Sequence, residues 1–221
     1  MPLIRGVILD MDGVIVDSEP FICEAATRFF AEKGLQVKPE DFAPFVGTGE
    51  NRYIGGVAEK YGLPFDVEPD KARTYAIYLE LIHGRLQPLP GVFSFLAECR
   101  QRRLKVAVAS SADAVKVEGN LREIGLPPGS FDALVHGNEV QRKKPYTDLF
   151  ETAAARLGLP ATECLVVEDA VAGVAAARAA GARCLALTTS FPAERLADAD
   201  WIAANLAEAP AAIWDTRRGC E

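Results

Sequence analysis

Residues 8–18 read ILDMDGVIVDS and bring acidic residues directly behind an apolar run. Asp10 and Asp12 follow the run Val7–Leu9, which is typical of a buried strand. Carboxylates at the end of a buried strand repel each other and are costly to desolvate unless a positive charge lies between them. A metal ion is the simplest source of that charge, so the stretch predicts a metal site.

Two further apolar runs end in polar residues. Ser110 and Ser111 follow KVAVA, and Glu168 and Asp169 follow CLVV. The carboxyl ends of strands line the ligand crevice in open α/β sheets, so we expect these groups to converge with the first acidic pair. Four carboxylates in one pocket need a cation. Oxygen ligands without a nearby histidine or cysteine favour Mg²⁺ over zinc, and we expect Asp10, Asp12, Glu168 and Asp169 to hold it.

The same pocket contains groups suited to a phosphoryl substrate. Lys144, in RKKPYTDLF, supplies a fixed positive charge, and Ser110 with the turn after it supplies neutral donors. Phosphoryl transfer needs positioning and charge neutralisation more than covalent help. Side chains at i and i+2 of an extended segment point the same way. We therefore assign Asp10 as nucleophile, forming an aspartyl-phosphate, and Asp12 as the acid and base that serves the leaving oxygen and then the water.

The elements that position these residues follow an α/β pattern. Short continuous apolar runs without alternation predict strands buried on both faces of a parallel sheet, and helical stretches lie between them. The predicted strands are GVILD, KVAVASS, ALVHG, CLVVED and CLALTT. The predicted core helices are VKVEGNLREIG, YTDLFETAAARLG and AVAGVAAARAAG. The expected fold class is a doubly wound parallel sheet.

A run of helices interrupts this rhythm after the first strand. We expect residues 18–86 to form a helical cap, and residues 1–17 with 87–221 to form the core. Three cap helices are predicted: EPFICEAATRFFAEKG, NRYIGGVAEKYG and PDKARTYAIYLELIHG. The inward face of the third is predicted to carry Ala72, Tyr75, Ala76, Leu79 and Ile82. The prolines of QPLPG suit a stiff tether, and AAIWDTRRGCE predicts a last helix with a frayed end.

Composition excludes several classes of protein. The 221 residues carry a formal net charge of -7, which argues against nucleic acid as a partner. The longest apolar run is far shorter than the roughly 20 residues that span a bilayer, and no signal peptide opens the chain. Five cysteines scattered through apolar runs suit a reducing compartment. We expect a soluble monomer in the cytoplasm, or in the plastid stroma if a transit peptide was removed.

Other interpretations of DMDGVIVDSE were weighed. A calcium loop would need an acid at Val14, a glycine at Ile15 and a glutamate at Phe21. A metal-binding DxD of a nucleotide-sugar transferase would leave Ser110 and Lys144 unexplained. A solvated acidic turn is the usual fate of a lone DxD, but four polar segments in this order make it the weaker interpretation.

The four segments resemble a known family. DMDGVIVDSE, VAVASSA, KKPYTDLF and VVEDAVAGVAAARAAG resemble, in order, the four motifs of the haloacid dehalogenase-like superfamily of phosphatases. The match covers essentially the whole chain. The resemblance implies a Rossmann-like core with an inserted helical cap, an aspartyl-phosphate intermediate and dependence on Mg²⁺.

Residue by residue, the resemblance gives the same roles. It maps the nucleophile to Asp10, the acid and base to Asp12, and phosphate contacts to Ser110 and Lys144. Metal ligation maps to Asp10, the Asp12 carbonyl and Asp169, with Glu168 in or beside the metal shell. Ser111 is a further candidate for substrate binding, since it lies in the same turn.

The cap and its surroundings resemble the subgroup that contains β-phosphoglucomutase. Dehalogenases and phosphonate-cleaving members lack an acid at the position of Asp12, which argues against both activities. The cap Lys-Gly-x-x-Arg of the mutase reads VGTGE here, from Val46 to Glu50, and its first cap-helix histidine is Ile22. We therefore favour hydrolysis of a small phosphorylated metabolite, a sugar phosphate, over a mutase reaction. A non-catalytic phosphatase-like interaction module is the third hypothesis.

Substrate contacts in the cap are predicted at the segment before its second helix: Gly47, Thr48, Glu50 and Arg52. Ser18 is expected to cap the first cap helix. A narrower resemblance joins DFAPFVGTGENRYIGGVAEKYG and KVAVASSADAVKVEGNL to the phosphatase-like domain of the chloroplast suppressor-of-quenching proteins of plants and algae. Those proteins have further domains, so the chain could be part of a longer protein.

Overall fold

The computed structural model describes residues 3–45 and 49–214, without the side chain of residue 50. A six-stranded parallel sheet forms its centre, in the order β3-β2-β1-β4-β5-β6. The strands are β1 (Gly6–Leu9), β2 (Lys105–Ala109), β3 (Ala133–Val135), β4 (Cys164–Glu168), β5 (Arg183–Leu187) and β6 (Trp201–Ala203). This arrangement confirms the predicted α/β class, with β1 between β2 and β4.

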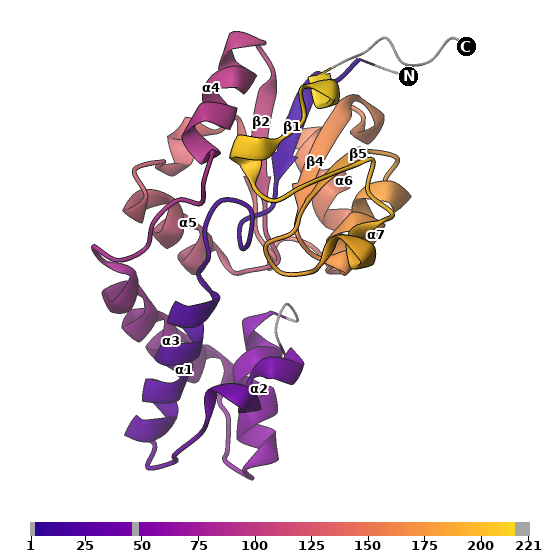
Figure 1. The fold of residues 1–221 in the computed structure, drawn as a ribbon. Helices are drawn as coiled ribbons and strands as arrows, with labels where there is room; N and C mark the ends of the chain where they lie inside the picture. Colours follow the sequence, from indigo (N-terminus) through magenta and orange to yellow (C-terminus); the bar gives the residue numbers. More distant parts are fainter. Residues whose placement is uncertain (1–2, 46–48, 215–221) are drawn as a thin grey trace.

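Helices cover both faces of the sheet (Figure 1), as the unalternating apolar strands require. Successive residues of β1 point to opposite faces. Val7 and Leu9 pack in the core that contains α4 (Val92–Gln101) and α5 (Ala114–Glu123). Ile8 packs in the core formed with α6 (Asp148–Arg156) and α7 (Val171–Ala179).

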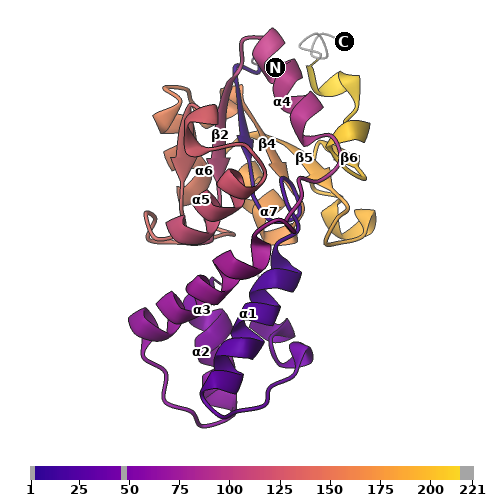
Figure 2. The ribbon, with the colours of Figure 1, turned by 90° about the vertical axis from the view of Figure 1, so that its left-hand side faces the viewer.

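The first three helices after β1 form a helical cap that lies apart from the sheet (Figure 2). It contains α1 (Glu19–Glu32), α2 (Glu50–Lys60) and α3 (Val67–Ile82). An aromatic cluster joins α1 to the rest of the cap: the Phe30 and Phe42 ring centroids are 6.2 Å apart, and Phe42 stacks on Tyr53 at 5.0 Å. The domain boundaries predicted after residues 17 and 86 stay a prediction.

The predicted inward face of α3 is wrong at three positions. Ala72, Ala76 and Leu79 are exposed, whereas Tyr75 and Ile82 are buried as predicted. The helix packs against α1 on one side and α5 on another, which turns its buried stripe away from the predicted one. That stripe consists of Asp70, Thr74, Tyr75, Ile77, Tyr78, Leu81 and Ile82.

The two connections between cap and core run side by side. Val16 forms an antiparallel bridge with Pro88, and the Leu89 amide donates a hydrogen bond to the Ile15 carbonyl at 2.8 Å. These two crossings, the chain segments that connect core and cap, are therefore hydrogen-bonded to each other where the cap begins.

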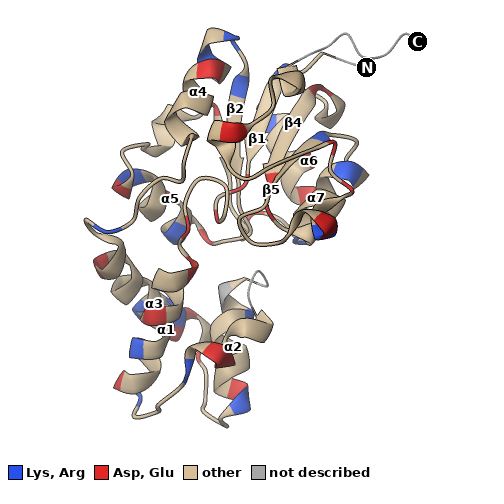
Figure 3. Ribbon diagram, in the orientation of Figure 1, with Lys and Arg blue, Asp and Glu red and all other residues tan. Residues whose placement is uncertain are grey.

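The sequence patterns did not predict β6 or α4. The predicted last helix is a 3₁₀ turn over Ala211–Trp214, and the tail after it lies outside the described residues. No helix of the described chain is long and apolar enough to cross a membrane. Acidic and basic residues are interspersed along the helices of both cap and core (Figure 3).

Phe30→Ala tests how far the cap depends on its aromatic cluster. Phe30 is fully buried and packs against Phe29 at a centroid distance of 5.2 Å. We expect a loss of about 3–5 kcal/mol in the free energy of unfolding, measured by urea denaturation. Phe93→Ala is the matched control, because Phe93 is 52% exposed on α4. Equal losses in the two variants would contradict this account of the cap.

Candidate active site

The turn after β1 brings the first acidic pair to the carboxyl edge of the sheet. The Asp10 amide donates to the Val167 carbonyl of β4 at 3.0 Å, so the backbone of β1 is held to its neighbour just where the strand ends. Gly13 then turns the chain with φ +75°, and a Cβ there would lie 1.8 Å from Asp169 Oδ2. Only glycine allows this turn to pass so close to the second acidic segment.

Lys144 is the central positive charge of the site. Its ammonium contacts Asp10 Oδ1 and Glu168 Oε1, and all three side chains are at most 10% exposed. The other Glu168 oxygen accepts the Asp169 and Ala170 amides, at 3.0 and 3.1 Å. The structure thus joins three of the predicted motifs through one lysine.

Asp169 faces the same pocket and is held by hydroxyl groups from the segment after β5. Ser190 Oγ donates to Asp169 Oδ2, and Thr189 Oγ1 lies 3.4 Å from that oxygen. Thr189 also donates to the Gly13 carbonyl at 2.6 Å. This segment therefore connects the fourth motif to the turn of the first.

The acidic groups have the arrangement of a site for a hard cation. Carboxylate oxygens of Asp10, Glu168 and Asp169 lie within 4.8 Å of one another, and all three residues are buried. Oxygen donors alone suit Mg²⁺. The donor set therefore fits the predicted ion.

Burial dominates the electrostatics of the acidic groups. It raises the pKa of Asp10 well above the usual value against the attraction of Lys144, and Glu168 and Asp169 raise this pKa further. Burial and the neighbouring Glu168 raise the pKa of Asp169 to about 7. Burial disfavours the charged form of Lys144, yet Asp10 and Glu168 leave its pKa above the usual value. A cation placed among these acids would relieve their repulsion.

Both oxygens of the Asp12 carboxylate have partners. Ser18 Oγ donates to Oδ1, and the Lys116 ammonium donates to Oδ2 at 3.0 Å. Ser18 occupies the N-cap position of α1 but makes no capping hydrogen bond with its side chain. The predicted capping role is therefore wrong, because the Ser18 hydroxyl is used to hold Asp12.

The turn after β2 supplies the predicted hydroxyls. Ser110 is 2% exposed and lines the pocket, and its Oγ accepts the Ala112 amide at 3.1 Å. The Ser111 carbonyl accepts a hydrogen bond from Lys143 at 3.0 Å. Lys143 reaches the cap as well, since a Cβ added to Gly49 would lie 2.3 Å from its Nζ.

Apart from Ser18, the side chains described above line one cavity of about 1020 Å³ between core and cap. The core side holds Asp10, Asp12, Ser110, Ser111, Lys144, Glu168 and Asp169. The cap side offers Ile22, Phe45 and Tyr53, which are apolar or aromatic, together with Gly49 and the acidic Glu19. The predicted core residues therefore converge, while the described cap wall is mainly non-polar.

The structure describes only part of the cap residues that were predicted to contact the substrate. Gly47 and Thr48 lie outside the described residues, and the Glu50 side chain is also undescribed. Arg52 does not line the cavity: it donates to Glu59 at 2.8 Å and its guanidinium lies 5.1 Å from the Phe45 ring centroid. Substrate contact by these four residues stays a prediction.

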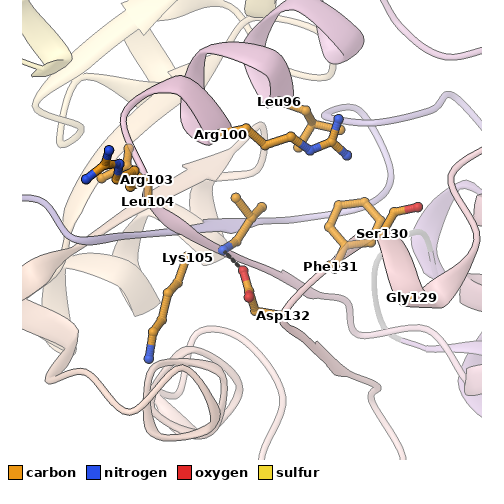
Figure 4. Close-up of a pocket in the computed structure, with 10 residues that line it drawn as sticks. Leu96, Arg100, Arg103, Leu104, Lys105, Gly129, Ser130, Phe131 and Asp132 are labelled. Atoms are coloured by element: carbon orange, nitrogen blue, oxygen red, sulfur yellow. Dashed lines mark hydrogen bonds between the residues drawn. The ribbon is translucent and has the colours of Figure 1, made fainter.

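A second hollow of about 400 Å³ lies at the opposite, amino-terminal edge of β2 and β3. Figure 4 shows Arg100, Arg103 and Lys105 at this hollow, together with Asp132, whose carboxylate accepts the Val106 amide at 2.8 Å. It contains none of the four motifs, so the chemistry belongs to the larger cavity.

Sequence reasoning missed two sets of residues at the site. Thr189 and Ser190 follow β5, and hydroxyls after a strand end were a usable signal. Lys116 was missed although it lies with Asn120 on the buried face of α5, beside Val117 and Leu121. A polar pair at i and i+4 within an apolar stripe could have marked it.

Comparisons with known proteins agree with this geometry. The family model for haloacid dehalogenase-like hydrolases matches residues 4–181. The chain is 44% identical over 199 residues to Protein SUPPRESSOR OF QUENCHING 1, chloroplastic, of Arabidopsis thaliana, and covers 19% of that protein. The alignment takes in 89% of this chain. The chain thus spans about a fifth of that relative's length.

Two further relatives match over most of their length. Fructose-1-phosphate phosphatase YqaB of Escherichia coli is 32% identical, with 80% of this chain and 92% of that protein aligned. The crystal structure of a putative β-phosphoglucomutase from Thermotoga maritima superposes with a TM-score of 0.73 at 27% identity, covering 90% of this chain and 94% of the other.

The family model covers well over half of the chain, and the fold and motif order agree with it. This chain belongs to the haloacid dehalogenase-like hydrolases, in the subgroup of β-phosphoglucomutase.

Proposed function

We propose that the chain is a Mg²⁺-dependent phosphatase that hydrolyses a phosphate monoester of a small metabolite through a phosphorylated Asp10. The observation that carries this proposal is the convergence of Asp10, Lys144 and the Glu168–Asp169 pair in the cavity that also holds Asp12. The family supplies the reaction class, because its members include phosphatases such as the E. coli relative.

In the first half-reaction, Lys144 holds Oδ1 of Asp10, and the other carboxylate oxygen attacks phosphorus. The new O–P bond forms as the bond from phosphorus to the leaving oxygen breaks. Asp12 gives its proton to that oxygen, and the alcohol leaves. Ser110 and Lys144 bind the phosphoryl oxygens at the floor of the cavity.

In the second half-reaction, Asp12 takes a proton from water, which attacks the phosphorus of the aspartyl-phosphate. The bond from Asp10 to phosphorus breaks, inorganic phosphate forms and Asp10 is regenerated. Asp10, Asp169, Glu168 and the Asp12 carbonyl would hold Mg²⁺, which supplies charge neutralisation for the phosphoryl group.

The substrate we propose is a sugar phosphate with one phosphate group. Ile22, Phe45 and Tyr53 give the cap side of the cavity a surface suited to a neutral carbon skeleton. Asp17 and Glu19 also line the cavity and would repel a second phosphate. The mutase cations of the subgroup correspond to positions 46 and 50, and neither side chain belongs to the described part of the structure.

We propose a compartment from the relatives only. The Arabidopsis relative is named chloroplastic, which supports the plastid stroma, while the bacterial relative supports the cytoplasm. A monomer without nucleic-acid or membrane partners completes the proposal.

Asp10→Asn tests the nucleophile. We expect the wild-type protein with Mg²⁺ to release inorganic phosphate from members of a sugar-phosphate panel, and the variant to lose at least about a thousandfold in kcat, because the amide is a poor nucleophile. Phosphorus NMR follows the products. Phosphate that moves between positions of one sugar without release would identify a mutase. No change in any sugar phosphate of the panel would favour a non-catalytic module.

Asp169→Asn tests the metal site without an activity assay. In the folded protein the pKa of Asp169 is raised to about 7. Ionisation of this carboxyl therefore opposes folding as the pH rises from the pKa that Asp169 has in the unfolded chain through 7. We expect the variant to melt at a higher temperature than the wild-type protein in EDTA at pH 8, and to lose the rise that Mg²⁺ gives the wild type. Asp198→Asn is the control, since the Asp198 side chain is 78% exposed. An equal Mg²⁺ response in all three proteins would count against this site.

Fructose 1-phosphate and fructose 1,6-bisphosphate test the number of phosphates. We expect kcat/KM to be at least roughly tenfold lower for the bisphosphate, because like charges facing each other across a binding site cost several kcal/mol. Initial rates of phosphate release measure both. Preference for the bisphosphate would show that the cap has a cationic subsite and would contradict the proposed substrate class.

A further inference from the structure

Lys116 is a buried cation that the reaction scheme above does not use. Its side chain is 3% exposed, and its ammonium lies 3.0 Å from Asp12 Oδ2 and 4.0 Å from Glu19 Oε1. Burying a lysine costs several kcal/mol unless a carboxylate compensates it. An aliphatic side chain would fill this position of α5 with less desolvation, so packing alone does not account for a lysine.

The contact fixes the direction of the Asp12 carboxylate. Ser18 holds Oδ1 from the connection to the cap, and Lys116 holds Oδ2 from α5. Asp12 has two rotatable side-chain bonds, and a carboxylate with only one oxygen held can still turn about the last of them. With both oxygens held, one orientation toward the cavity is selected. Proton transfer needs heavy atoms within about 2.6–3.2 Å, so such selection affects the rate directly.

The helix that carries Lys116 is also the core helix that cap helix α3 contacts. Lys71 of the cap pairs with Asp113, the residue before α5, at 2.8 Å. Tyr78 of the cap donates to Asn120 of α5. The Gly84 amide, just after α3, donates to Glu123 at 2.6 Å. Asn120 lies one helical turn beyond Lys116. The cap therefore contacts the same face of α5 from which Lys116 reaches Asp12.

We propose that Lys116 is a positioning residue that aims the Asp12 carboxylate at the leaving oxygen, and that the packing of α3 on α5 sets this aim when the cap is seated. The inference rests on the proposed function, since it gives Asp12 its role in protonating the leaving group. Lys116 itself touches neither the phosphoryl group nor the nucleophile in this scheme.

The test compares substrates that differ in their need for that proton. p-Nitrophenyl phosphate leaves as a stable phenolate and needs little protonation, whereas phenyl phosphate has the same ring and charge but a poorer leaving group. In Lys116→Met we expect the ratio of kcat for p-nitrophenyl phosphate to kcat for phenyl phosphate to rise about tenfold or more, since general acid catalysis contributes roughly 10²–10⁴ to rate. The same kcat ratio is measured for Lys116→Gln. This second variant carries the test if Lys116→Met does not fold.

Two comparisons separate positioning from a structural role. In an Asp12→Asn background the ratio is already high, and Lys116→Met should raise it no further, because the two residues act as one unit. Lys33→Met, which removes the Lys33–Asp70 pair of the cap at 2.7 Å, should leave the ratio unchanged. Circular dichroism confirms that each variant is folded.

The outcomes distinguish this inference from the proposed function. A wild-type protein that hydrolyses neither these aryl phosphates nor any member of the sugar-phosphate panel contradicts the proposed function itself. A wild-type protein that hydrolyses these esters, with Lys116 variants that lose both activities in equal proportion, overturns the positioning role alone. An additive effect of Lys116→Met on the Asp12→Asn ratio would overturn it as well.

Discussion

The contact of Lys144 with Asp10 and Glu168 is the interaction on which the rest of the site depends. Three acids lie buried at one sheet edge, and their burial, together with the repulsion among them, raises the pKa values of Asp10 and Asp169. One lysine offsets part of that repulsion and joins segments that are more than 130 residues apart in the chain. A net negative charge remains around it, which is the condition for attracting a cation.

The parallel sheet makes that contact achievable. β1 pairs in parallel with β2 and β4, so the carboxyl ends of the three strands lie next to one another at the same edge of the sheet. The residues that follow them need no long loops to meet. Gly13 allows the turn of the first motif to pass against Asp169, and Thr189 ties that turn to the segment after β5. The groups of the candidate site are therefore held at the ends of buried strands.

Sequence patterns predicted the core much better than the cap. Continuous apolar runs identified five strands, and polar residues at their ends identified Asp10, Asp12, Ser110, Lys144, Glu168 and Asp169 as neighbours. The short β6 was missed because two of its three residues are only partly buried and Ile202 is exposed, which makes a weak apolar signal. In α3, Leu79 was assigned inward by its hydrophobicity, although it is 38% exposed. A helix that packs against two elements has a buried stripe that its own sequence does not determine.

The sequence patterns also did not predict which side chains from separate segments would pair. Nothing in the spacing relates Lys116 to Asp12, 104 residues away, because the contact depends on where α5 packs. Ser18 shows the same limit: its place before α1 predicted a cap, but the neighbouring carboxylate competes for the same hydroxyl. The capping rule fails there because a charged carboxylate is a stronger hydrogen-bond partner than a backbone amide.

The paired crossings between core and cap limit how the two parts can move. Two separate single strands would let the cap swivel about the line that joins it to the core. Here the Ile15–Leu89 hydrogen bond and the Val16–Pro88 bridge make the crossings a short antiparallel ribbon. A ribbon bends across its flat face more readily than it twists or shears within its plane. We therefore expect the cavity to open by a rocking motion, with the cap returning to the core in the same lateral register each time it closes.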